Sequence, residues 1–198
     1  MYQSGAQLID AAAVLRHVGV DKGWHVADLG CGALGHFVFP AAELVGGAGK
    51  VYAVDIQRLA LERIQKQAKV QQLWNVIPVW SDIDVVHAAR IPNRSLDLTL
   101  VADNLYLSEN RSGLVKEAIR LTKPGGKILV IEWKRERPLI GPPVERRLTV
   151  EEAESCFRDA ELKKIDSFEA GDHHFAITFQ RLNADPMTEI LSVSYPTS

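Results

Sequence analysis

Short apolar runs typical of buried strands alternate along the chain with segments whose apolar residues recur at helical spacing. The runs are rich in valine, leucine and isoleucine and predict strands over residues 24–29, 50–55, 76–80, 96–102 and 127–133. Helix-period segments lie before the first run and between most of the others. This alternation favours βαβ units joined into a parallel sheet.

The helical segments have recognisable faces and ends. Leu8, Ala12 and Leu15 share one face of an opening helix, and further helices are expected over 35–45 and 58–73. Pro40 is compatible with a helix only near its first turn. A further helix before the fifth strand is expected to carry Leu114, Ala118 and Leu121 on one face.

The last third of the chain changes character. Prolines at 138, 142 and 143 predict a loop, and Thr149 with Glu152 three residues later has the pattern of a capping box that opens a helix to about residue 160. Strands are expected over 163–168 and 174–180. Because only four residues join them, too few for a crossover helix, they should pair antiparallel. We expect one domain over residues 1–182 and a frayed polar tail over 183–198.

The composition is that of an ordinary globular protein, with 46% hydrophobic and 24% charged residues and a net charge of -2. This charge gives no overall attraction to nucleic acid or to an anionic membrane. The basic residues at 134–137 and 146–147 are interpreted as solvated surface. Cys31 and Cys156 predict neither a disulfide framework nor a metal cluster, which fits a reducing cytoplasm. We find neither a secretory signal nor an apolar run of membrane-spanning length.

A glycine-rich turn follows the first expected strand. Residues 30–35 read G-x-G-x-x-G, and Asp55 ends the second strand, where a carboxylate can accept hydrogen bonds from both hydroxyls of a ribose. This pattern serves NAD(P) and S-adenosylmethionine (SAM) equally well, because both present an adenosine ribose at this position.

Asp28, two residues before the first glycine, favours SAM. Its carboxylate would repel a pyrophosphate, whereas SAM carries a sulfonium and an ammonium that a nearby acid stabilises. An alternative is that Asp28 only caps the loop. Two further absences favour SAM: no tyrosine is followed four residues later by lysine, and no second domain for a hydride acceptor is visible.

The chain resembles the class I SAM-dependent methyltransferases over residues 8–182, most closely the small ubiquinone/menaquinone C-methyltransferase-like group. The resemblance is carried by the ordered segments 26–32, 51–55, 95–97 and 117–126. The third glycine departs from the family pattern, since Gly35 lies one residue later than usual. The resemblance implies a Rossmann-like, doubly wound α/β fold of three layers, with seven strands in the order 3-2-1-4-5-7-6 and the last strand antiparallel.

The resemblance also implies roles toward SAM. The glycines would let the backbone approach the methionine part, Asp55 would bind the ribose, Ile56 would pack on the adenine and Asp82 would bind its amino group. Taken alone, Asp82 is as readily a loop cap. The expected cofactor-binding residues are Asp28, Gly30, Cys31, Gly32, Gly35, Asp55, Ile56, Ser81, Asp82, Ile83 and Asp103.

Catalytic candidates are sought at the carboxyl ends of the strands, where ligands of open α/β sheets bind. The candidates after the fourth strand are Asp103, Asn104 and Tyr106; this segment resembles a loop of amino-group methyltransferases but lacks its two prolines, so cofactor contact and capping remain alternatives. His173 and His174 precede the last strand, where loop histidines are more often plain surface. Glu132 and Trp133 are candidates to line the acceptor pocket. The opening helix, residues 2–15, is either a lid or a packing helix.

The resulting hypothesis is methyl transfer by in-line displacement to a small-molecule acceptor, aromatic or quinone-like. A general base is needed only if the acceptor must lose a proton. A protein or nucleic-acid acceptor is a second reading, and a SAM-binding protein without turnover, acting as a sensor or partner subunit, is a third. The sequence assigns neither the base nor the oligomeric state, and two cysteines do not support arsenite chemistry.

Overall fold

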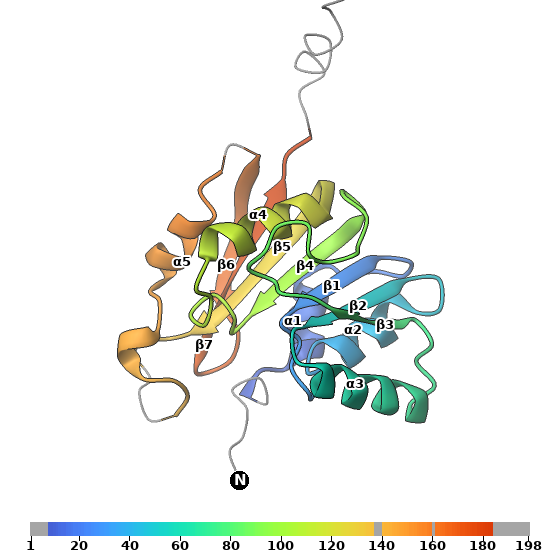
Figure 1. The fold of residues 1–198 in the computed structure, drawn as a ribbon. Coiled ribbons are helices and arrows are strands. Elements are labelled where there is room, and N and C mark those ends of the chain that lie inside the picture. The colour runs from blue at the N-terminus through green and yellow to red at the C-terminus, as the bar shows by residue number, and fades with distance from the viewer. Residues whose placement is uncertain (1–7, 137–139, 160, 184–198) are drawn as a thin grey trace, which may run out of the picture.

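One mixed sheet of seven strands runs through the protein, in the order β3-β2-β1-β4-β5-β7-β6. A computed structural model describes residues 8–136, 140–159 and 161–183. Figure 1 shows the sheet with helices on both of its sides. The strands are β1 (His25–Leu29), β2 (Lys50–Asp55), β3 (Val76–Trp80), β4 (Leu96–Ala102), β5 (Thr122–Trp133), β6 (Leu162–Glu169) and β7 (His174–Arg181). The helices are α1 (Ala11–Val18), α2 (Val38–Val45), α3 (Arg58–Val70), α4 (Arg111–Leu121) and α5 (Val150–Cys156).

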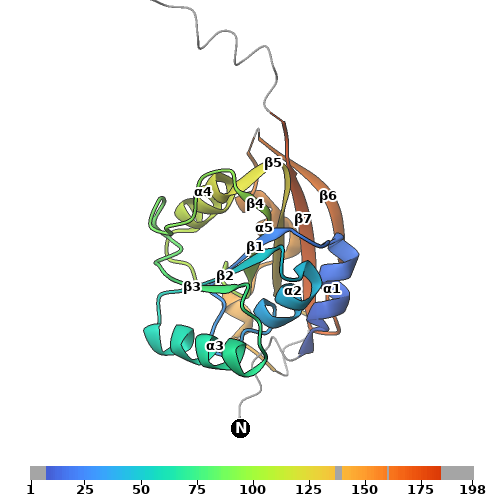
Figure 2. The ribbon, with the colours of Figure 1, turned by 90° about the vertical axis from the view of Figure 1, so that its right-hand side faces the viewer.

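Two separate hydrophobic cores hold the helices against the sheet. Helices α1, α2 and α3 pack on one face, where fully buried side chains include Leu15, Val38 and Ile64. Helices α4 and α5 pack on the other face, with Leu114 and Ala153 buried. In Figure 2, which is turned by 90° from Figure 1, α1 and α2 lie on the opposite side of the sheet from α4. The three-layer α/β/α arrangement and the strand order predicted above are confirmed.

The parallel strands bring their carboxyl ends to one edge of the sheet. Strands β1 to β5 pair parallel to one another. Strand β7 pairs antiparallel with both β5 and β6, as the short connection predicted. The first residue of β7, His174, therefore lies opposite Trp133 at the carboxyl end of β5. All candidate residues at strand ends thus meet at this one edge.

Element boundaries differ from the expected ones at a few ends. Strand β5 begins at Thr122 and not after the 124–126 turn, because Leu96 pairs with Thr122 and Leu98 with Lys127, so the intervening residues bulge out. Helix α2 begins at Val38, after turns that follow the glycine loop, and α3 ends at Val70. Helix α5 ends at Cys156, short of residue 160, which lies outside the described residues. Its Thr149–Glu152 capping box is present. Among the described residues, no helix is both long and apolar enough to cross a bilayer.

The expectation that residue 147 is solvated surface is wrong. Arg147 is 1% exposed. Its guanidinium donates to the carbonyls of Lys134 and Pro142, at 2.8 and 2.9 Å, and lies 5.3 Å from the Trp133 ring. A buried arginine is tolerated where its donors satisfy carbonyls of irregular backbone. Arg147 therefore holds the backbone at Lys134 and at Pro142 beside the end of β5.

Candidate functional site

The glycine loop leaves the end of β1 and is tied to β2. The backbone N–H groups of Gly30 and Cys31 both donate to the carbonyl of Val54, at 2.8 and 3.0 Å. Gly32 has a φ of 63°, and a Cβ added to it would meet nothing within 4 Å, so this part of the loop faces open space. A Cβ on Gly35 would instead lie 2.6 Å from Ile64 Cδ1, which makes Gly35 a helix-packing position. The space beside Gly32 is therefore open, so a ligand could approach the protein backbone at this point.

Two acids, Asp55 and Asp28, lie beside this loop. Asp55 accepts hydrogen bonds from the backbone N–H of Gly32 (2.9 Å) and of Gln57 (2.8 Å). Asp28 is 3% exposed. Burial, with a contribution from the charge of Asp55, raises the pKa of Asp28 to about 7. Burial and the same two carboxylates raise the pKa of the Cys31 thiol, which makes it a poor nucleophile; its contact with the cofactor stays a prediction.

Asn104 joins the segment after β4 to the glycine loop. Its amide Nδ2 donates to the carbonyls of Leu29 (3.0 Å), Gly30 (3.1 Å) and Ala102 (2.7 Å). A Cβ on Gly30 would overlap the Asn104 side chain. The amide donors of Asn104 are therefore committed to positioning the loop, which disfavours the target-amine role considered from the sequence.

The residues expected to surround an adenine lie at the ends of β2 and β3. Ile56 is 55% exposed, so its side chain is accessible to an adenine ring. Ser81 is buried, and its backbone N–H donates to the carbonyl of Asp55 at 3.1 Å. Asp82 is exposed and accepts from the backbone N–H of Asp84 at 2.9 Å, and Ile83 is half-buried. The four residues share one end of the sheet, while their contact with adenine stays a prediction.

A buried polar cluster lies beside the loop, at the ends of β4, β5 and β7. The Nε2 atom of His174, which is fully buried, lies 3.4 Å from Oδ2 of Asp103. Glu132 is also fully buried, and its Oε1 accepts from the backbone N–H of Leu105 at 2.7 Å. Burial and the charge of Asp103 raise the pKa of Glu132 well above its usual range. The interpretation of His174 as plain surface is therefore wrong, and His173 is only partly exposed.

Trp133, at the end of β5, packs against this cluster. It is buried and does not line an open pocket, as had been considered from the sequence. It is 4% exposed, its ring centre lies 4.2 Å from that of His174, and a Cβ on Gly141 would lie 2.5 Å from Cζ3 of its ring. Tyr106 is half-buried. Burial, followed by Asp103 and Glu132, raises its pKa.

The beginning of the described chain also reaches this edge. A Cβ on Gly171, in the turn between β6 and β7, would lie 2.7 Å from the carbonyl oxygen of Leu8. His36 Nε2 lies 2.8 Å from the carbonyl oxygen of Ile9. Helix α1 itself packs in the core through Val14 and Leu15, so the packing interpretation holds for its described part. Residues 2–7 of the expected lid lie outside the described residues.

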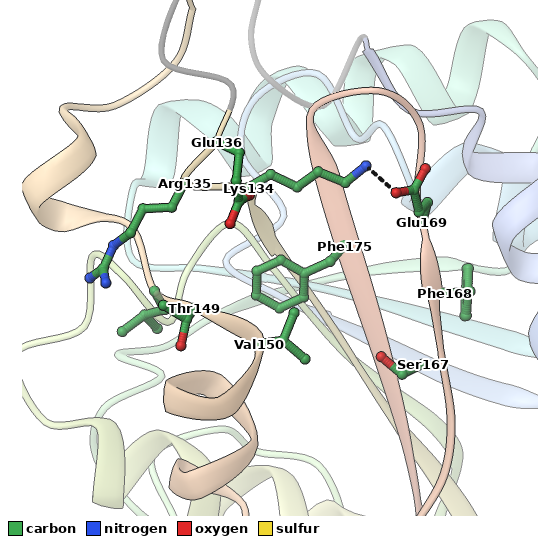
Figure 3. A pocket seen from close by; sticks show the side chains of 10 residues that line it. Lys134, Arg135, Glu136, Thr149, Val150, Ser167, Phe168, Glu169 and Phe175 are labelled. Carbon is green, nitrogen blue, oxygen red and sulfur yellow. Dashed lines mark ion pairs between the residues drawn. The ribbon is translucent and has the colours of Figure 1, made fainter.

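A pocket of about 320 Å³ opens farther along the same edge, between β6, β7 and the start of α5. Figure 3 shows the Phe175 ring among Thr149, Val150 and Ser167, with the extended Lys134 side chain bonded to Glu169. The Lys134–Glu169 ion pair measures 3.0 Å. None of the residues that line the pocket belongs to the glycine loop. It is thus a feature separate from the expected cofactor position.

Sequence reasoning missed His36 and Asp84. His36 lies close enough to Asp103 and His174 for their charges to act on it, although burial dominates and lowers its pKa. Asp84 accepts from the Ser108 hydroxyl at 2.7 Å and so ties the segment after β3 to the segment after β4. Nothing in the local pattern marks these residues, because both contacts join segments that are distant in sequence.

Comparisons with known proteins agree with this geometry. A family model described as "Methyltransferase domain" matches residues 20–183. The demethylmenaquinone methyltransferase of Geobacillus sp. (strain WCH70) is 27% identical over 122 residues, which are 60% of this chain and 49% of that protein. The ubiquinone/menaquinone biosynthesis C-methyltransferase UbiE of Pseudoalteromonas translucida (strain TAC 125) is 32% identical over 121 residues, 59% of this chain and 45% of that protein.

The chain thus spans about half the length of these curated relatives. A solved structure is similar over nearly its whole length: the crystal structure of a SAM dependent methyltransferase from Aquifex aeolicus has a TM-score of 0.80 and 26% identity, and covers 89% of this chain and 92% of its own. With the glycine loop, the paired acids and the strand order, these matches place the chain in the methyltransferase-domain family, among the class I SAM-dependent methyltransferases.

Proposed function

We propose that this protein binds SAM at the glycine loop and transfers its methyl group to a small-molecule acceptor. The observation that carries the proposal is the buried Asp28, whose neighbouring charge is a second acid, Asp55, beneath a loop that is open at Gly32. A ligand with positive charge relieves the repulsion between two acids, whereas a pyrophosphate would add to it. The two carboxyl groups of Asp28 and Asp55 therefore fit the positive charge of SAM better than a pyrophosphate.

The residues around the loop would divide the binding of SAM among them. Asp55 keeps a free lone pair on each oxygen besides its bonds to the N–H groups of Gly32 and Gln57, so it can still accept from ribose hydroxyls. Ile56, Ser81, Asp82 and Ile83 would surround the adenine. Asp28 and Asp103 would lie near the methionine part.

Bound SAM supplies an activated methyl group on a sulfonium that leaves readily. The protein's own contribution is then mainly to hold the acceptor in line with the carbon–sulfur bond and to exclude water. Asp103 and Tyr106, after β4, and His173 and His174, before β7, are the groups we place at the acceptor.

We place aromatic or quinone-like compounds first among the acceptors. The relatives are named for methylation of demethylmenaquinone and for ubiquinone and menaquinone biosynthesis, which supports this class. The cytoplasm is the proposed compartment, because both cysteines are free thiols.

Calorimetric titration with SAM, S-adenosylhomocysteine (SAH) and NAD tests the cofactor. We expect micromolar binding of SAM and SAH and no binding of NAD. Binding of NAD alone would mean that the chain is a dinucleotide-binding protein. Release of labelled methyl groups into any acceptor would exclude a SAM sensor without turnover.

The variant Asp55→Ala tests the ribose assignment. Each hydrogen bond lost to a charged acceptor contributes about 1.5–3 kcal/mol, so SAM affinity should fall at least tenfold while the protein stays folded. Asp21→Ala is the matched control, because exposed Asp21 bonds only locally to the N–H of Lys22. Equal SAM affinity of the two variants would refute the ribose role.

A further inference from the structure

An exposed tryptophan stands at the end of β3, beside the turn that joins β2 to α3. Trp80 is 55% exposed, so it adds little to either hydrophobic core. Strand β3 lies at the edge of the sheet, and Trp80 is paired in register with Asp55, the last residue of β2. The contacts of Trp80, and not its burial, therefore indicate what it does.

The indole of Trp80 is bonded to the turn after β2. Its Nε1–H donates to the backbone carbonyl of Ile56 at 2.8 Å. The guanidinium of Arg58, the first residue of α3, lies over the same ring at 4.1 Å from the ring centre, where a cation–π attraction holds it. Trp80 thus contacts the segment 56–58 at both of its ends.

This turn takes its shape from its neighbours. Within the described part of the chain, Gln57 stands at the N-cap of α3 but makes no side-chain capping bond. The turn is held instead by Asp55, which accepts from the N–H of Gln57 at 2.8 Å, and by the N–H of Ser81, which donates to the carbonyl of Asp55 at 3.1 Å. The bond from the Trp80 indole extends this support to Ile56.

Asp55 and Ile56 are the residues expected to bind the ribose and the adenine. The Ile56 side chain is 55% exposed, so little packing of its own fixes its position. A site whose groups are already in place binds more tightly, because less conformational freedom is lost on binding. Loss of the indole bond should therefore weaken cofactor binding while both hydrophobic cores stay intact.

We propose that Trp80, with Arg58 on its ring, is a positioning residue for the cofactor and fixes the turn that presents Asp55 and Ile56 to the adenosine part. The inference rests on the proposed function. Trp80 acts through the carbonyl of Ile56 and not by touching the reacting atoms.

Calorimetric titration of Trp80 variants with SAH tests this role. Trp80→Phe keeps a ring for Arg58 and removes the N–H donor, so SAH should bind about three- to tenfold more weakly. Trp80→Ala removes the ring as well and should bind SAH no more tightly than Trp80→Phe. Thermal melting checks that each variant is folded.

Trp74 provides the matched control, because it is 76% exposed and lies just before the other end of β3. Trp74→Phe should bind SAH as the wild type does. Unchanged SAH affinity in Trp80→Phe, or an equal loss in Trp74→Phe, overturns the proposal. Failure of the wild-type protein to bind SAH would refute the proposed function, and this inference with it.

The part of Arg58 is tested with a second pair of variants. Arg58→Gln removes the cation from the ring and should lower SAH affinity about two- to fivefold. Lys66→Gln removes a cation from the exposed side of the same helix and should leave the affinity unchanged. Equal affinities of the two variants overturn the part assigned to Arg58.

A spectroscopic reading separates positioning from a purely structural bond. In protein labelled with ¹⁵N-tryptophan, the indole resonance that is absent from Trp80→Phe belongs to Trp80. This resonance should shift when SAH binds the wild type, because a ligand on Ile56 alters the bond between the indole and the Ile56 carbonyl, whereas the Trp74 resonance should not move. If the Trp80 resonance stays in place while SAH binds, Trp80 does not act on the cofactor site and the proposal is overturned.

Discussion

Asp28 is a residue whose burial opposes folding. A carboxyl with a pKa raised to about 7 holds a proton in the folded protein over a range where the unfolded chain, with a pKa of 3.8, has already lost it. The folded state therefore binds more protons than the unfolded state between these values, and stability falls as the pH rises through them. Above about pH 7 the folded protein carries the full free-energy cost of burying the ionised Asp28.

The variant Asp28→Asn removes this ionisation. Relative to the wild type it should gain stability as the pH rises from 4 to 7, by up to about 4 kcal/mol from the size of the shift. Urea unfolding at a series of pH values measures the difference, in which the contribution of Glu132 cancels. Parallel stability curves for the two proteins would contradict the prediction. The variant should also bind SAM more weakly at pH 8, because it lacks the carboxylate.

Gly30 and Gly32 should respond differently to the same substitution. Both have positive φ, which costs an alanine about 1–2 kcal/mol. Gly32→Ala adds a methyl group in open space, so it should lose only that stability but at least tenfold in SAM affinity. Gly30→Ala also overlaps Asn104 and should lose about 2–5 kcal/mol.

Chemical denaturation and calorimetry of both variants check this contrast. Equal loss of stability would show that Asn104 moves aside freely. Undiminished SAM affinity of Gly32→Ala would mean that the cofactor does not approach the loop at this point.

At the scale of elements, side chains at strand ends hold the edge of the sheet together. Asn104 links the segment after β4 to the end of β1, and Asp84 links the segments after β3 and β4. Neither contact belongs to the sheet's own hydrogen bonds. The arrangement of the loops therefore depends on a few polar side chains whose loss leaves the strands intact.

Asn104→Ala should lower the stability by about 1–3 kcal/mol and also weaken SAM binding, because the glycine loop loses its support. Thr149→Ala is a control of similar cost: Thr149 caps α5 by accepting from the N–H of Glu152 at 3.2 Å, and a lost cap costs about 1 kcal/mol. Thermal melts and calorimetry compare the two. If both variants weaken SAM binding equally, the effect is one of general stability.

The sequence predicts elements better than the contacts between them. Strands β2, β3 and β4 match their expected bounds, since sharp changes of polarity flank each apolar run. Helix ends differ by a few residues because a helical pattern fades gradually. Asp28 and the glycines stand in one local motif and Asp55 ends the next strand, so local patterns were enough to propose them, while their contact with SAM stays a prediction. The pairing of Asp103 with His174 was not, because it depends on β7 lying beside β5.

At the scale of the molecule, the expected domain over residues 1–182 remains to be tested. Both hydrophobic cores pack against the same sheet, so we expect them to unfold together. SAH at a hundred times its dissociation constant should stabilise the protein by about 2.7 kcal/mol and raise the melting temperature by about 5–11 °C in a single transition. Scanning calorimetry with and without SAH measures this. Two transitions, only one of which responds to SAH, would divide the domain.

The place of β7 between β5 and β6 sets an order on the completion of the sheet. Strand β5 pairs with β4 through segments that come earlier in the chain, but its other edge stays open until residues 174–181 are available. An open apolar edge invites pairing with other chains, and such non-local pairing forms slowly. A chain arrested before β7 would hold the glycine loop and expose the side of β5 where Asp103 later meets His174. The end of the sheet where Asp103 lies beside His174 is thus the last part to be completed as the chain folds.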